Sequence, residues 1–103
     1  MEVVNIKDFC SQNAVTQISN VRVNENGYPF LTFLSKAFEG GAQNIYFSRA
    51  QAAKVHVAQT PKELGIAEYK VVTTSNAAGE ERLKLTTSEY ANVEDLFAAE
   101  VAA

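Results

Sequence analysis

Cysteine, histidine and tryptophan are nearly absent from this sequence, and their scarcity excludes several kinds of site. The chain has one cysteine, Cys10, one histidine, His56, and no tryptophan. A single cysteine cannot form a disulfide within the chain, and one cysteine with one histidine cannot supply the ligands of a Cys/His zinc site. We therefore expect no disulfide, no metal site and no cofactor, in a cytoplasmic setting.

Long apolar runs and a basic N-terminal region are also missing. No apolar stretch approaches the roughly 18–20 residues that span a bilayer. An acid, Glu2, stands where an export signal would carry basic residues. These absences predict a cytoplasmic protein with no membrane contact.

Groups suited to catalysis are few. A catalytic dyad of Cys10 and His56 is formally possible. However, cysteine is commonly a small core residue, and nothing near Cys10 in the sequence would activate its thiol. The side chains of the adjacent pairs Glu80-Glu81 and Glu94-Asp95 diverge, which makes both pairs poor candidates for acid–base work. We therefore predict that the protein is not an enzyme.

Charge is distributed unevenly along the 103 residues, whose formal net charge is −3. Residues 1–87 hold all nine Lys and Arg against eight acids, which leaves +1. Residues 88–103 hold the other four acids and no base, which leaves −4. These totals exclude a strongly basic protein that coats DNA, but they allow a locally basic face.

The chain does contain enough apolar residues for one small core, because 47% of its residues are hydrophobic. We expect an N-terminal segment over residues 1–14, a β-rich domain over 15–88 and an acidic C-terminal helix or tail over 89–103. Asn5 either caps a short helix over 6–10 or follows a strand that begins at Val3.

The strongest strand pattern lies around a tight turn at Asn26-Gly27. Residues 17–23 and 28–34, on either side of it, predict a β-hairpin. A loop of two residues and a loop of four residues place the same side chains on the same side of the sheet, because side chains alternate along a strand. One side, the expected core, then carries Val21, Val23, Tyr28 and Phe30, and the other carries Asn20, Arg22, Leu31 and Phe33.

Residues 43–47 predict a third strand, and a capping box at Ser48 and Gln51 predicts a helix over 48–57. Thr60, followed by Pro61 and Glu63, predicts a second helix start. Alternation over 67–73 and 82–86 predicts a second hairpin. An apolar stripe predicts a C-terminal helix over 92–101. The stripe consists of Val93, Leu96, Phe97 and Val101.

The resulting order, β-β-β-α-β-β with a C-terminal helix, is mainly β. With the segment from Val21-Arg22-Val23 through Phe33, it resembles the small OB-fold single-strand-binding proteins of bacteria and phages over about residues 15–87. The resemblance implies a small OB-like, five-stranded barrel that binds oligonucleotides. The alternative is an α+β sheet of the kind found in PC4-like and Whirly-like DNA-binding proteins.

Aromatic and basic residues supply the candidate site. Phe33 and Tyr46 share strand faces with polar residues and are candidates for stacking on nucleobases, although Phe33 could instead pack beneath a terminal segment. Arg22, Lys36 and Arg49 are candidates for phosphate contacts. Three cations on the polar face of the second hairpin form either a solvated face or a second phosphate-binding surface: Lys70, Arg82 and Lys84.

These features favour a module that binds single-stranded DNA or RNA with little sequence preference, alone or as a homo-oligomer. The acidic, apolar segment 92–101 would recruit a protein partner or occupy the basic surface when no strand is bound. The alternative is a non-enzymatic protein-interaction module, such as a phage-type inhibitor or an assembly factor. Exposure of Arg22, Phe33 and Tyr46 on one groove would favour nucleic acid, and burial of the aromatics beside an acidic patch would favour the alternative.

Overall fold

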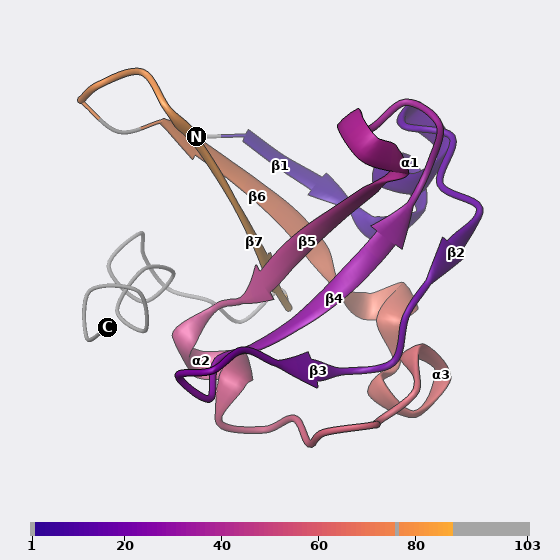
Figure 1. Ribbon diagram of the computed structural model, residues 1–103, viewed down its shortest axis with the longest axis vertical. Helices are drawn as coiled ribbons and strands as arrows, with labels where there is room; N and C mark the ends of the chain where they lie inside the picture. Colours follow the sequence, from indigo (N-terminus) through magenta and orange to yellow (C-terminus); the bar gives the residue numbers. More distant parts are fainter. Residues whose placement is uncertain (1, 76, 88–103) are drawn as a thin grey trace.

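The computed structural model describes residues 2–75 and 77–87. Within them the fold is mainly β, a single sheet that curls into a half-barrel (Figure 1). Its strands are β1 (Glu2–Asn5), β2 (Gln17–Ile18), β3 (Arg22–Val23), β4 (Pro29–Leu34), β5 (Ala42–Phe47), β6 (Lys70–Ser75) and β7 (Glu81–Thr86). The helices are short: α1 (Ile6–Gln12), α2 (Arg49–Ala52) and α3 (Pro61–Leu64), with single 3-10 turns at Glu39–Gly41 and Ile66–Glu68.

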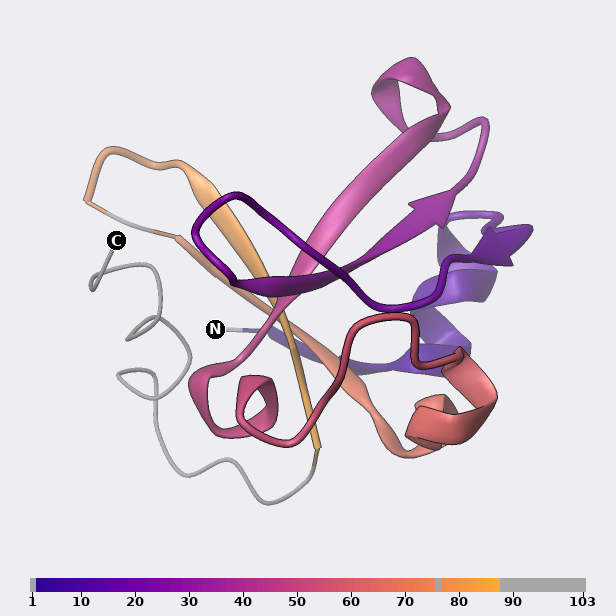
Figure 2. The same cartoon turned by 60° about the horizontal axis from the view of Figure 1, so that its bottom comes forward.

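The strands follow the order β1-β6-β7-β5-β4, with β2 and β3 both paired to β4. Every pairing is antiparallel except that of β5 with β7, which is parallel. The hairpin β6–β7 therefore lies beside the hairpin β4–β5, and α2 and α3 belong to the connection between them (Figure 2). The predicted third strand and second hairpin are confirmed as β5, β6 and β7.

Both readings of the N-terminal segment are present, one after the other. β1 pairs with β6, and the helix α1 begins immediately after it. The side-chain oxygen of Asn5 accepts a hydrogen bond from the backbone N–H of Asp8 at 2.8 Å, which is the expected cap. Ile6 and Phe9 on this helix are buried in the core, so residues 2–12 are part of the same folded body.

The predicted register of the first hairpin is wrong. Arg22 lies opposite Phe30, and backbone hydrogen bonding between Asn24 and Tyr28 closes a loop of three residues. Gly27 ends this loop with φ +84°, the left-handed residue that a three-residue hairpin loop requires. An odd loop length shifts the pairing by one residue and so exchanges the faces expected for β4.

The core lies on the concave side of the half-barrel, which we call the inner face, and the opposite side is the outer face. The inner face carries the buried side chains Leu31, Phe33, Ile45, Phe47, Val71 and Leu85. Phe33 has no exposed surface, and its ring meets that of Phe9 edge-on with centroids 5.6 Å apart. Burial excludes the stacking role of Phe33 and confirms the alternative, packing beneath the N-terminal segment, while Phe30 takes the outer face.

The predicted helix over 48–57 is also wrong in its length, because α2 ends at Ala52. The capping side chains are engaged elsewhere: the hydroxyl of Ser48 lies 3.3 Å from that of Thr86, and the amide of Gln51 donates to Thr87. Beyond α2 the chain runs back along the first hairpin and exchanges backbone hydrogen bonds with Val21. Long-range bonding has replaced the local helix.

The second predicted helix start is confirmed. The hydroxyl of Thr60 accepts from the backbone N–H of Glu63, and the carboxylate of Glu63 accepts from the backbone N–H of Thr60, both at 3.1 Å. Pro61 occupies the first turn and Gly65 ends the helix with φ +69°. No described helix is long and apolar enough to cross a membrane. The predicted helix over 92–101 lies outside the described residues.

Candidate functional site

Cations and acids of the described strands lie on opposite faces of the sheet. The register places four cations at outward positions of the described strands and no acid: Arg22, Lys70, Arg82 and Lys84. The inward positions of the same strands carry two acids, Glu2 and Glu81, and no base. Because side chains alternate along each strand, the pairing alone produces this separation.

Four side chains cross the outer face as one row, which we call the aromatic row: Arg22, Phe30, Tyr46 and Lys84. They are successive cross-strand partners on β3, β4, β5 and β7. The rings of Phe30 and Tyr46 lie with centroids 5.1 Å apart at an interplanar angle of 42°. A cation covers each ring, with Arg22 Cζ and Lys84 Nζ each 5.6 Å from a centroid. Such contacts hold the rings and the cations in place.

Polar groups beside the aromatic row fix its position further. The side-chain amide of Asn24 donates to the hydroxyl of Tyr46 at 3.4 Å, while its carbonyl oxygen accepts from two backbone N–H groups of the hairpin loop. In the next outward positions along β4 and β5, the hydroxyl of Thr32 donates to Asn44 at 2.7 Å. The outer face thus joins an aromatic pair to hydroxyl and amide groups.

Exposure differs among these residues and decides what each can do. Arg22 and Arg82 are exposed, and Tyr46 and Lys70 are half-buried. Phe30 and Lys84 are only 7% and 1% exposed, so neither offers much surface to a ligand. Tyr46 is consequently the more exposed aromatic of the row, and Phe30 and Lys84 pack against its ring.

The structure brings together some of the predicted site residues and separates others. Tyr46 and four of the predicted cations share the outer face. Phe33 is in the core. Lys36 is exposed in the loop after β4, six residues beyond Phe30 and past the end of the strand at Leu34. Arg49 is exposed at the start of α2, two residues beyond β5.

Phe30 is the site residue that the sequence argument missed. A signal for it was present: Asn24, a residue that accepts hydrogen bonds from turn amides, lies three residues before Gly27. This pattern fits a three-residue loop as well as a shorter or longer one, and only the odd length places Phe30 beside Tyr46.

Groups with intrinsic reactivity lie away from the outer face. Cys10 is half-buried on α1 against the core, and burial raises the pKa of its thiol, which lowers the fraction of reactive thiolate. His56 is exposed in the connection between α2 and α3. Among residues 2–75 and 77–87, no three His, Cys, Asp or Glu side chains gather as a metal site would require.

Comparison of the chain with protein-family models, with curated proteins and with solved structures found no match.

Proposed function

We propose that this protein binds single-stranded DNA or RNA with little sequence preference through the outer face of its sheet. The observation that carries the proposal is the separation of charge: the outward strand positions around Phe30 and Tyr46 carry no acid, and three of their cations, Arg22, Lys70 and Arg82, are exposed or half-buried. Aromatic rings beside a positively charged surface are the usual means of holding a single strand.

Each exposed group has a role in this proposal. The half-buried ring of Tyr46 stacks on a base, which contributes about 1–3 kcal/mol. The guanidinium groups of Arg22 and Arg82, with Lys70, contact phosphates on either side of the ring. Stacking on a ring face and contact with the backbone do not distinguish base edges, so little sequence preference is expected.

The arrangement of elements supports an OB-like reading of the half-barrel. The helical connection lies between β5 and β6, as it would between the third and fourth strands of such a barrel, and β7 returns to pair with β5. The curled, partly open sheet agrees with the same reading. β1 is an addition to the five-stranded order.

A polarisation titration tests the proposal. Labelled oligo-dT and oligo-U of about 15 nucleotides are titrated with the protein at low and at moderate salt. Tyr46→Ala should weaken binding by about 1–3 kcal/mol while the fold remains intact. Arg82→Ala and Arg22→Ala should each reduce the salt dependence by about one unit of slope. Lys36→Ala removes an equally exposed charge from the far end of β4 and should change neither quantity.

Two results would contradict the proposal. One is the absence of binding to either oligonucleotide at low salt. The other is binding that Tyr46→Ala and Arg82→Ala leave unchanged, or that Lys36→Ala weakens as much as they do. The first result would favour the alternative, a protein-interaction module, for which the two acids at inward strand positions, Glu2 and Glu81, provide the supporting observation.

A further inference from the structure

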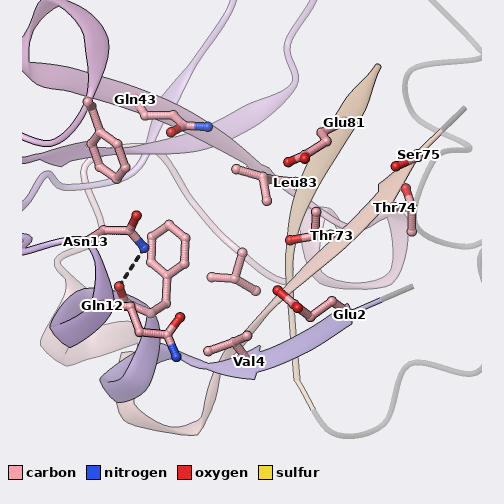
Figure 3. Close-up of a pocket in the computed structure, with 13 residues that line it drawn as sticks. Glu2, Val4, Gln12, Asn13, Gln43, Thr73, Thr74, Ser75, Glu81 and Leu83 are labelled. Carbon is pink, nitrogen blue, oxygen red and sulfur yellow. Dashed lines mark hydrogen bonds between the residues drawn. The ribbon is translucent and has the colours of Figure 1, made fainter. Parts of the chain in front are cut away.

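A cavity of about 760 Å³ opens on the inner face at one end of the half-barrel (Figure 3). Its walls come from β1, β5, β6, β7 and α1, with Phe9 and Phe38 as an aromatic side wall. These two rings stack with centroids 6.3 Å apart. The volume lies in the range of about 300–1,000 Å³ that is usual for ligand sites.

The cavity exists because the inward positions of four strands become polar at the same level. Along β6 the inward residues run from buried Val71 to Thr73 and then to Ser75. Along β7 they run from buried Leu85 through Leu83 to Glu81. On β5 and β1 the inward positions at this level are likewise polar, namely Gln43 and Glu2. The apolar core therefore stops at this level, because buried polar side chains would need hydrogen-bond partners.

The charged residues among the described lining of the cavity are both acids, with no Lys, Arg or His. Glu2 and Glu81 extend into it from β1 and β7, the strands on either side of β6. The hydroxyl of Thr73 lies near the two carboxylates, and the amides of Gln12 and Gln43 line the other side of the cavity. Such a lining accepts a cationic group and repels a phosphate.

A free strand edge borders this cavity. β1 pairs with β6 along one edge, from Glu2 opposite Thr73 to Asn5 opposite Lys70. In the described part of the chain no strand pairs with its other edge, and Val3 is 45% exposed. An unpaired edge presents a row of backbone donors and acceptors to which another strand can bind.

We infer that an extended basic segment of a partner protein adds to the free edge of β1 and places alternate Lys or Arg side chains in the acidic cavity. The edge supplies main-chain hydrogen bonds, and the alternation of side chains sends every second residue to the inner face. The carboxylates of Glu2 and Glu81 then select a basic side chain at that position. This surface lies on the opposite face from the proposed nucleic-acid site, so the inference does not depend on that function.

Blocked eight-residue peptides and the full-length protein test the inference. The probe is a peptide with alternating Thr and Lys, and its matched control alternates Thr and Glu. Binding is followed by NMR through the backbone amides of β1 and the residues around the cavity. We expect the basic peptide to bind and to shift the amides of residues 3–5, and the acidic peptide to do neither.

Protein variants then assign the binding to the carboxylates. Glu81→Gln and Glu2→Gln should each weaken binding of the basic peptide about two- to five-fold, as expected for loss of a partly exposed ion pair. Glu25→Gln removes an exposed carboxylate from the first hairpin loop and should have no effect. None of these variants should lower oligonucleotide affinity, which separates a failure here from a failure of the proposed function.

Four outcomes would overturn the inference. The first two are that the basic peptide does not bind and that the acidic peptide binds equally well. The third is undiminished binding of both peptides that carry methyl groups on alternate backbone nitrogens, one set starting at the first residue and the other at the second, because main-chain pairing to β1 would then be unnecessary. The fourth is that lysine amide alone reproduces the shifts around Glu81 without shifting the β1 amides, which would indicate a site for small cations.

Discussion

Phe30 and Phe33 lie on the same strand, β4, and have opposite roles because they face opposite sides of the sheet. Phe33 fills the core against Phe9, whereas Phe30 supports Tyr46 on the outer face. We predict that Phe33→Ala lowers the free energy of unfolding by about 3–5 kcal/mol, the cost of removing a fully buried ring. Urea denaturation measures this loss. A loss below about 1 kcal/mol would contradict the burial of this ring.

Tyr69 gives the protein a dependence on alkaline pH. Burial raises the pKa of its hydroxyl, which donates to Gln51 at 3.3 Å. A raised pKa in the folded state means that the protonated form contributes stability below the ordinary tyrosine pKa of about 10 and that this contribution is lost as the pH rises further. The free energy of unfolding should therefore fall from about pH 9 upward.

The matched variant is Tyr69→Phe, measured over the same pH range. It removes the ionisable group, so its free energy of unfolding should fall less steeply with pH than that of the unaltered protein. Equal slopes for the two proteins would show that Tyr69 does not control the alkaline transition.

At the scale of elements, the first hairpin depends on Asn24. Its side chain holds the three-residue loop through two backbone amides and also contacts the hydroxyl of Tyr46. We predict that Asn24→Ala destabilises the protein by about 1–3 kcal/mol, because loop amides lose their acceptor. Thermal unfolding measures the effect, and Asn26→Ala, in the same loop, should cost less. An equal cost for both would remove the special role of Asn24.

The two helix starts show when a local signal prevails. Thr60 is half-buried and Glu63 is exposed, no other described partner competes for them, and the capping box forms as their spacing predicts. Ser48 and Gln51 have the same spacing, but they are buried and bond to β7 and to the residue that follows it. Thr60→Ala should cost about 1 kcal/mol in chemical denaturation, the usual value of a cap, and a neutral change would contradict its role.

At the scale of the whole molecule, the net charge changes sign along the chain after residue 87. Residues 1–87 carry +1 and residues 88–103 carry −4. We predict that neutralising Glu94, Asp95 and Glu100 together, as Gln, Asn and Gln, raises oligonucleotide affinity at low salt, because fewer acids then compete with phosphate. The gain should shrink as salt rises. A polarisation titration measures it, and an unchanged affinity would show that these acids do not act on the site.

The amino-acid sequence by itself determined the mainly β class, the presence of both hairpins and the Asn5 and Thr60 caps, but not the register of the first hairpin. These depend on alternation, turn residues and capping side chains, which act within a few residues along the chain. The absence of clustered His and Cys likewise followed from composition alone. The sequence predicts a local structure correctly where no distant residue competes for its hydrogen-bonding groups.

Only the tertiary structure decided which aromatic side chains face a ligand. The loop between Asn24 and Tyr28 has three residues, whereas two or four were expected. Because side chains alternate between the faces of a strand, this difference of one residue places Phe30 on the outer face and Phe33 on the inner face. The parallel pairing of β5 with β7 then placed Lys84 beside Tyr46, across 38 residues of sequence. The separation of cations and acids between the two faces arises from these pairings, which depend on the energy of the whole sheet rather than on any single segment.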